Sequence, residues 1–592
     1  MINTKNQLTL AIEHHQNGNF EKAKSIYNNL LQNFPNDIDI LYYYGILCLQ
    51  VSELDKALEL LNKVIELNPE DQLYKNVLIL TGDIYMNKQD FHQAKNYYLF
   101  SIEIDNQDFV PYFNLGVVYH NIKEFCKAVE YYNLALKINP ELAECYKKLI
   151  SIYSQNAEID KVIDCYLSLI KLQPDEASHY FNIAIEYSKK RDLDNSHRAY
   201  LNAVYLNPNF VEAYVNLGDL YFRTFNFNQA LECLQKAYRI NPDIVECLNN
   251  LTNVYLELRK PDKAIELCLE GLRKFPDNNF LSQNLARAQF LIGDIDNGWE
   301  YFKYRRISNE NKNFKSYLLD YKGSLKDKKI LVYHDSGFGD TIQFSRYLPL
   351  LGNTGAKVIC KVQSQLVSLL QSNNNLKTEI ISKSETIKDT DYDMSINLTT
   401  LAYLFKTDIN QIPLKKRYIF PISEKVVQYK EKYFNNNDYK IGIVWKALTH
   451  PSKNISDISL FFPLAKSSKI KLYSLQKEGT EEFQDKMPSD IKLIDIGSSF
   501  RDFSDTAAAI ENLDLIITAD TAIAHLAGAM GKQTLVLLPY SPNWRWFLDR
   551  QDCPWYDSIK LLRQKEPGNW FSVFEEIYNI LKEKAFCTNM KL

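Results

Sequence analysis

Five prolines recur at a fixed interval in the first half of this chain. Pro140, Pro174, Pro208, Pro242 and Pro276 are each separated from the next by 34 residues. A fixed period of this length is typical of arrays built from one repeated helix pair, because each pair buries its apolar face only by stacking on its neighbours. The proline ends the second helix of each pair, since its ring clashes with a continuing turn. The spacing therefore predicts an α-solenoid.

Small and large residues alternate at matching positions in each unit. Small residues allow two helices to approach closely, and tyrosine or leucine fills the space between them. In the unit that ends at Pro140, the marker residues are Tyr112, Leu115, Gly116, Tyr119, Ala128, Tyr132 and Ala135. This pattern is that of the tetratricopeptide repeat (TPR). We count about nine repeats and assign residues 1–306 to the solenoid.

An amide side chain recurs at the sixth position of the first helix of most repeats, a position that lines the concave groove of such arrays. An asparagine amide donates and accepts hydrogen bonds at once, so a column of them can hold an extended peptide by its backbone. Two interpretations stay open, namely a ladder that binds a protein or peptide acceptor and a residue that this position merely tolerates. The residues are Asn114, Lys148, Asn182, Asn216, Asn250 and Asn284.

The composition is that of an ordinary globular protein. Apolar residues make up 46% and charged residues 24% of the chain, and the net charge of −4 gives no general attraction to nucleic acid. The N-terminal segment lacks the apolar core of a secretory signal, and no apolar run reaches bilayer length. We therefore expect a cytoplasmic protein without a membrane span and without a nucleic-acid partner.

After residue 306 the helical period gives way to alternating strands and helices. Such alternation predicts parallel sheets covered by helices on both faces. We expect two Rossmann-like lobes, over residues 307–434 and 435–592, with the polar stretch 424–439 as a linker. The last helical segment, within residues 569–584, is a candidate to cross back onto the first lobe. Ligands of such sheets bind beyond the carboxyl ends of the strands.

The second lobe contains a strand-to-helix turn that is typical of anion binding. Asp520 and Thr521 follow the strand LDLIITA, and the next helix offers the N–H groups of Thr521, Ala522 and Ile523 to a diphosphate. Asp520 can also accept hydrogen bonds from sugar hydroxyls, and His525 lies on the same helical face as Thr521. The alternative is an ordinary helix cap with a histidine in the core.

Two further segments of the second lobe carry candidate donor-binding residues. Gln476 and Lys477 end a strand and suit a diphosphate, and Glu478, Glu481 or Glu482 could hold a ribose diol. A solvated charged loop explains the same residues. In a later turn, Phe503 could stack on a base and Asp505 could cap a helix.

In the first lobe, the segment GFGDTIQF places Asp340 at the start of a helix after the strand KILVY. A carboxylate there repels phosphate, so this turn is not an ordinary nucleotide site. The lobe also contains the string Asp391-Tyr392-Asp393. We discount a metal site there, because no further acids converge on it in the sequence.

Several of these segments together resemble a known architecture. HDSGFGDTIQFSRYLPLL, DFSDTAAAIENLDLIITADTAIAHLAGAMGK and LLPYSPNWRWFLDRQDCPWY are similar to bacterial proteins that join tetratricopeptide repeats to a family 9, heptosyltransferase-like glycosyltransferase domain of the GT-B type. The overall plan also resembles O-GlcNAc transferase. The resemblance implies inverting transfer of a sugar from a nucleoside diphosphate, with no obligatory metal and no other cofactor.

The resemblance also implies roles for individual residues. Asp340 would face the acceptor and take the proton of its hydroxyl, and the second lobe would hold the donor. Lys477, Lys453 and the helix start at Thr521 would stabilise the leaving diphosphate. The alternative for Asp340 is a helix cap. Asp335-Ser336 and WKALTHP depart from the family pattern, which keeps a non-catalytic scaffold open, and a glycan or lipid-linked acceptor is the third possibility.

Overall fold

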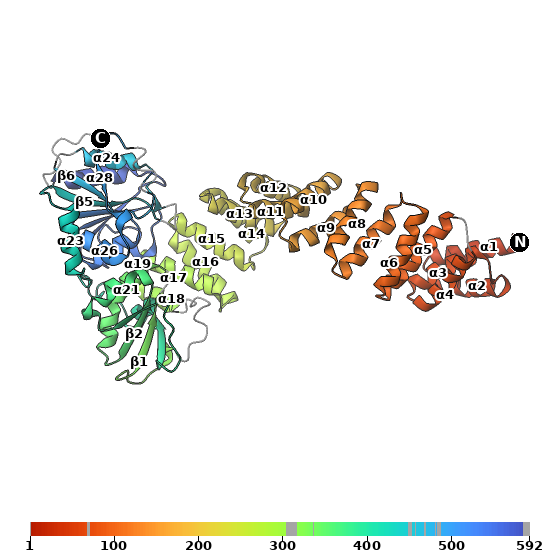
Figure 1. Cartoon of the computed structure of the whole chain (residues 1–592), viewed down its shortest axis with the longest axis horizontal. Coiled ribbons are helices and arrows are strands. Elements are labelled where there is room, and N and C mark those ends of the chain that lie inside the picture. The colour runs from red at the N-terminus through yellow and green to blue at the C-terminus, as the bar shows by residue number, and fades with distance from the viewer. Residues whose placement is uncertain are drawn as a thin grey trace. The chain divides into compact units, whose positions relative to one another are not determined.

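The computed structural model describes residues 2–67, 71–303, 317–334, 337–447, 453–455, 457–466, 469–479, 481, 487–489 and 491–583. The chain divides into two compact units, Met1–Leu220 and Tyr221–Leu592 (Figure 1). Among the described helices, none combines the length and the apolar character needed to cross a bilayer.

The first unit is an array of helix pairs, drawn from red to olive in Figure 1. Glycines of the first helices face a leucine or a tyrosine of the second helices, and a Cβ on Gly116 would lie 2.5 Å from the ring of Tyr132. The predicted pairing of a small residue on one helix with a large one on the other therefore allows the two helices of a repeat to pack closely. The helices are α1 (Ile2–Gln16), α2 (Phe20–Asn33), α3 (Ile38–Gln50), α4 (Leu54–Glu66), α5 (Asp71–Asn87), α6 (Phe91–Ile104), α7 (Phe109–Asn121), α8 (Phe125–Ile138), α9 (Ala143–Gln155), α10 (Ile159–Leu172), α11 (Ala177–Lys189), α12 (Leu193–Leu206) and α13 (Val211–Arg223).

Helix α13 reaches the boundary between the units, and five more solenoid helices belong to the second unit. They are α14 (Phe227–Ile240), α15 (Val245–Glu257), α16 (Pro261–Lys274), α17 (Asn279–Ile292) and α18 (Ile295–Phe302). In the described part of the chain, eighteen helices thus precede the first strand, which confirms the predicted solenoid of about nine helix pairs.

The remainder of the second unit contains two parallel sheets. The first has the order β3-β2-β1-β4 and the second the order β10-β9-β8-β5-β6-β7. Counted from the first strand of each sheet, these orders are 3-2-1-4 and 3-2-1-4-5-6, the arrangement of doubly wound nucleotide-binding sheets. The strands are β1 (Lys329–Tyr333), β2 (Lys357–Val362), β3 (Glu379–Ser382), β4 (Met394–Asn397), β5 (Tyr439–Val444), β6 (Ile470–Ser474), β7 (Leu493–Asp495), β8 (Leu515–Ala519), β9 (Thr534–Leu538) and β10 (Ile559–Arg563).

Helices connect and cover these strands. The α-helices are α19 (Phe338–Phe344), α20 (Leu348–Gly352), α21 (Ser364–Gln371), α22 (Leu401–Leu404), α23 (Ser423–Tyr433), α24 (Phe462–Ala465), α26 (Phe503–Glu511), α27 (Ala522–Ala529) and α28 (Phe571–Glu583). Single 3₁₀ turns lie at η2 (Leu318–Asp320), η3 (Ser345–Tyr347), η4 (Asn374–Leu376), η5 (Leu398–Thr400), η7 (Ile458–Phe461), η8 (Gly497–Ser499) and η9 (Trp544–Trp546).

Two expectations about these helices are wrong. Most of the polar stretch 424–439 is not a linker, because Ser423–Tyr433 forms helix α23, which lies against α26 of the second lobe. Helix α28 does not cross to the first lobe. Its residues Phe574 and Ile577 belong to one core cluster with Ile443 of β5, so it covers the second sheet.

An aromatic cluster joins the last solenoid helices to the α/β region within the second unit. The ring of Phe290 on α17 stacks on Trp544, with 4.4 Å between ring centroids. Trp299 and Phe302 of α18 contact Trp544 edge-on. Trp299 also meets Phe344 of the first lobe at 6.0 Å. The last helix pair therefore shares one apolar core with both lobes.

Candidate functional site

Two predicted site residues, Asp340 of the first lobe and His525 of the second, lie on helices α19 and α27, which contact one another. Helix α19 follows strand β1, and α27 follows strand β8. Strand β1 is hydrogen-bonded to β4, and β8 to β5, so both helices begin beside the point where the strand order of their sheet reverses. Such switch points are where open parallel sheets bind ligands.

Asp340 of the first lobe is paired with a cation from the second lobe. It is the third residue of α19, and its Oδ1 accepts a hydrogen bond from Nη2 of Arg545 on η9. The Nε of Arg545 donates to Oε1 of Gln343 at 3.0 Å, and its guanidinium lies 4.3 Å from the ring of Trp544. The side chains of Asp340 and Arg545 are 18% and 9% exposed. The acid is thus held at the junction of the lobes.

Asp520 forms a second ion pair in the second lobe. Its Oδ2 lies 2.5 Å from Nζ of Lys453, and both side chains are largely buried. Burial alone would raise the pKa of Asp520, but the positive charge of Lys453 outweighs it and the pKa is lowered. The two charges stabilise one another as an ionised pair.

His525 lies between the two lobes as a neutral base. Its ring stacks on Trp546 at 5.0 Å, and its Nδ1 is 3.1 Å from the hydroxyl of Tyr556. Burial, aided by the charge of Arg545, lowers the pKa of His525 to about 3. A Cβ on Gly339 of α19 would lie 2.7 Å from its Cδ2, so glycine is required there for the two helices to approach.

The start of helix α27 is partly satisfied by its own cap. The hydroxyl of Thr521 accepts a hydrogen bond from the N–H of Ile523 at 3.3 Å. Three N–H groups are predicted to bind a diphosphate, and that of Ile523 is therefore already bonded. The other two belong to Thr521 and Ala522, which are half-buried residues at the helix start. Thr521 is the cap, and Asp520 precedes it.

The strand-end residues of β6 divide into buried and exposed ones. Gln476 is 5% exposed, and its Oε1 accepts a hydrogen bond from the backbone N–H of Lys446 at 3.2 Å. Lys477, Glu478 and Glu481 are exposed, as expected of a loop in solvent. Glu482 lies outside the described residues. In the first lobe, Asp391 and Asp393 accept hydrogen bonds from backbone N–H groups at 2.9 and 2.8 Å.

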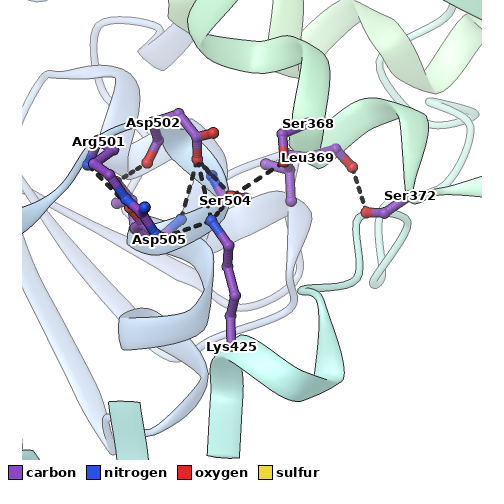
Figure 2. A network of polar contacts seen from close by, with 9 residues as sticks. Ser368, Leu369, Ser372, Lys425, Arg501, Asp502, Ser504 and Asp505 are labelled. Carbon is purple, nitrogen blue, oxygen red and sulfur yellow. Dashed lines mark hydrogen bonds and ion pairs between the residues drawn. The ribbon is translucent and has the colours of Figure 1, made fainter. Parts of the chain in front are cut away.

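Phe503 and Asp505 lie at the start of α26, beside the first lobe. The ring of Phe503 meets that of Phe338 on α19 at 5.0 Å. The expectation that Asp505 caps this helix is wrong, because Asp502 is the cap and accepts from the N–H groups of Ser504 and Asp505. Burial would raise the pKa of Asp505, but its bond to Lys425, at 2.6 Å, lowers it (Figure 2).

Figure 2 also shows how this start of α26 is tied to α21 of the first lobe. The hydroxyl of Ser368 on α21 donates to that of Ser504 at 3.4 Å, and Lys425 of α23 donates to the same oxygen at 2.5 Å. Three helices from different parts of the chain therefore share one polar network.

The groove asparagines are not equivalent. In the first unit, Asn114 donates through Nδ2 to Asp83 at 3.1 Å, and Asn182 and Asn216 are half-buried on α11 and α13. In the second unit, Asn250 is half-buried on α15, whereas Asn284 is 7% exposed and accepts from Arg287 at 3.3 Å. Asn284 is therefore engaged within the protein itself.

Sequence reasoning did not single out three residues that build this junction. Arg545, Trp546 and Arg346 all lie in quoted motifs, yet only the folded chain shows their partners. Arg346 is fully buried and donates through Nη1 to the carbonyl of Trp555 at 2.8 Å, which links the first lobe to the second. The available signal was the unusual density of arginine and tryptophan in NWRWF.

Comparison with known proteins identifies the repeats. Family models described as tetratricopeptide repeat match residues 14–78, 76–108, 111–142 and 211–244. The N-terminal region is therefore a TPR array. The protein FlbA of Caulobacter vibrioides is 22% identical over 332 residues, which cover 51% of this chain and 55% of FlbA. The chain thus aligns with little more than half the length of this relative.

Solved structures of repeat proteins align with part of this chain. The C-terminal part of a TPR repeat-containing protein from Cytophaga hutchinsonii is 16% identical, with a TM-score of 0.37, and the alignment covers 41% of this chain and 99% of that one. YrrB, described as a TPR protein with an unusual peptide-binding site, is 21% identical with a TM-score of 0.28 over 32% of this chain and 95% of its own.

Proposed function

We propose that the protein is a GT-B type glycosyltransferase that moves a sugar from a nucleoside diphosphate to a hydroxyl group on a protein acceptor. The observation that carries this proposal is the convergence of Asp340 with His525 and Arg545 where α19 meets α27. The resemblance of the motifs to family 9 glycosyltransferases supports the same reaction. A TPR array supports a protein as the acceptor, because such arrays present extended surfaces for polypeptide binding.

In the proposed reaction the acceptor oxygen attacks the anomeric carbon while its proton passes to Asp340. The new carbon–oxygen bond forms as the bond to the diphosphate oxygen breaks, and the leaving nucleoside diphosphate takes the electron pair. Arg545 holds Asp340 through Oδ1. Among the described residues Oδ2 has no hydrogen-bond partner, which suits it to receive the proton.

We propose that residues of the second lobe stabilise the negative charge of the leaving diphosphate. Lys453 and the start of α27 at Thr521 lie next to Asp520, and the same short segment holds His525 as a neutral ring. Because its imidazole is neutral, His525 does not form an ion pair with the nearby carboxylates and does not add a positive charge to the donor site. Gln476, which follows β6, and Phe503, which begins α26, are assigned to the donor, with Lys477 and Glu481 as exposed residues.

Asparagine at position 340 tests the assigned base. D340N keeps an oxygen for Arg545 but cannot accept the proton. Transfer from whichever nucleotide sugar the unmodified protein uses should therefore fall by about 10²–10⁴-fold. Product formation is followed by mass spectrometry with a panel of UDP-, GDP- and ADP-sugars, and nucleotide affinity by calorimetry. Affinity should change less than about twofold. D391N, an exposed acid of the same lobe, is the matched control. Undiminished turnover in D340N would overturn the assignment.

The charges named above are side chains of the protein, so we propose that transfer needs no dissociable divalent metal. Prolonged dialysis against EDTA should leave the initial rate unchanged, as measured with the same mass-spectrometric assay. Loss of activity that Mg²⁺ or Mn²⁺ restores would contradict this part of the proposal. If transfer were lost both in D391N and after EDTA treatment, the Asp391-Tyr392-Asp393 string would be the metal-binding segment.

A non-catalytic scaffold is the second candidate function. The observation that favours it is that both predicted acids are ion-paired, Asp340 with Arg545 and Asp520 with Lys453. A scaffold with closed lobes would show neither donor hydrolysis nor a rise in melting temperature with any nucleotide sugar of the panel. A donor that raises the melting temperature, because it binds the folded state alone, would reject this alternative.

A further inference from the structure

The first unit contains a pocket of about 420 Å³ that no role assigned above uses. Its apolar wall consists of Leu49 on α3, Met86 on α5 and Val117 on α7. Its polar wall consists of Asp83, Asn87, Tyr98 and Asn114. The first helices of three successive repeats thus contribute to one pocket, so the occupant contacts the faces that line the groove of a TPR array.

Asp83 is the charged group of this pocket, and two neighbouring side chains orient it. The hydroxyl of Tyr98 donates to its Oδ1 at 2.7 Å, and Nδ2 of Asn114 donates to the same oxygen at 3.1 Å. Among the described residues, no lysine or arginine forms an ion pair with Asp83. Burial raises the pKa of this carboxyl, as expected of an acid that lacks a compensating cation.

We propose that this pocket binds the side chain of a lysine or arginine from a polypeptide that lies along the repeats. Both side chains have an apolar stem and a cationic tip. The stem fits the wall formed by Leu49, Met86 and Val117, and the tip reaches the oriented carboxylate of Asp83. A partly buried carboxylate gains more from such a cation than an exposed one, because water screens the pair less. This inference holds whether or not the lobes catalyse sugar transfer.

The proposal also changes the role of Asn114. Its amide is engaged by Asp83, so at this repeat it positions an acid rather than binding a peptide backbone directly. The bound polypeptide is therefore recognised here by one of its side chains. A uniform backbone ladder would not distinguish one sequence from another, whereas this pocket selects a basic residue.

Four blocked pentapeptides test the proposal on the full-length protein. They have the form acetyl-Gly-Gly-Xaa-Gly-Gly-amide, with lysine, arginine, norleucine or glutamate at Xaa, and binding is measured by ligand-observed NMR without any nucleotide sugar. The lysine and arginine peptides should bind about tenfold or more tightly than the norleucine peptide, because only they form a charged hydrogen bond to the partly buried carboxylate of Asp83. Equal binding of lysine and norleucine peptides would overturn the proposal.

The variant D83N should lose that preference, and D219N is the matched control. Asp219 occupies the equivalent position four repeats later, since 83 plus four times 34 is 219. D219N should retain the preference in full. If D83N binds the basic peptides as the unmodified protein does, or if D219N loses as much affinity as D83N, the pocket is not the site.

A pocket-filling variant keeps the test decisive if D83N folds poorly. Val117 is half-buried on the pocket wall, so V117F reduces the volume without altering charge. It should weaken binding of both basic peptides about tenfold or more while circular dichroism stays unchanged. Because the peptide assay contains no nucleotide sugar and measures no transfer, failure of the transferase proposal is distinguishable from failure of this one.

Discussion

At the residue scale, the acid in the glycine turn has a physical explanation that the sequence did not show. Asp340 is balanced by Arg545, a residue 205 positions later in the chain. The guanidinium fork binds Asp340 and Gln343 together and lies on the face of Trp544. An anion at this helix start is thereby compensated from the opposite lobe, and any phosphate would have to be held elsewhere.

His525 predicts how stability depends on pH. Its pKa is about 3 in the folded protein and about 6.5 in an unfolded chain. Between these values the unfolded state binds one more proton, so the free energy of unfolding falls as pH is lowered from about 6.5 toward 3. The expected loss from this residue is about 1.4 kcal/mol per pH unit.

Denaturant unfolding at several pH values measures this effect. In H525Q the side chain no longer titrates. Between about pH 6.5 and 3, the variant's free energy of unfolding should therefore depend less on pH, by about 1.4 kcal/mol per pH unit. The other histidines are the same in both proteins, and the difference between the two profiles therefore reports on His525 alone. Parallel profiles for the two proteins would contradict the assignment of a buried neutral ring.

Arg545 should act as a positioning residue for Asp340. R545K keeps a positive charge but loses the planar fork that bonds Asp340 and Gln343 at once. We expect kcat to fall by about tenfold or more with little change in nucleotide affinity, and steady-state kinetics with the reactive donor would measure both. A purely structural role would instead lower the melting temperature with kcat per folded molecule unchanged.

At the element scale, close helix packing in the repeats depends on residues without a side chain. Gly116 should not tolerate alanine, because the added methyl would lie 2.5 Å from the ring of Tyr132. We expect G116A to destabilise the first unit by about 1–3 kcal/mol, although alanine is the better helix former. Thermal unfolding followed by circular dichroism measures the change, and in a Y132L background the penalty should shrink.

Long periodic elements were predictable from the sequence, and short or polar ones were not. The 34-residue period defined the solenoid because every repeat makes the same contacts with its neighbours. The polar composition of 424–439 predicts a linker, whereas Ser423–Tyr433 forms helix α23 on α26 although none of its residues is fully buried. Strand β3 has only four residues, too few to show a pattern without its partner in the sheet.

The candidate site was predictable only as a set of segments. The turns after β1 and β8 could be placed at strand ends by pattern alone, and the structure brings Asp340 and His525 to one junction. Their partners could not be predicted, because Arg545 reaches Asp340 across 205 residues of chain and Lys453 reaches Asp520 from a separate loop. The predicted donor role of Asp520 must include this ion pair.

At the scale of the whole molecule, the last solenoid helices cannot be separated from the α/β region. Residues 221–592 should give a soluble protein with a cooperative melting transition. Residues 307–592 should aggregate, because removal of Phe290, Trp299 and Phe302 exposes the apolar face of Trp544. Size-exclusion chromatography and calorimetry of the two fragments test this. A monomeric, cooperatively folding 307–592 fragment would show that the ring cluster is dispensable.

The ring cluster around Trp544 has a consequence for how such a chain can vary. It anchors one end of the array together with the preceding repeat, where Arg259 pairs with Asp549 of the second lobe. In arrays of this kind, repeats still further toward the N-terminus contact only their neighbours. Helix pairs could be inserted or deleted there in blocks of 34 residues without disturbing a single contact of Asp340 or Arg545. If both proposals hold, the length of polypeptide that the repeats bind could change without any change in the chemistry proposed for the two lobes.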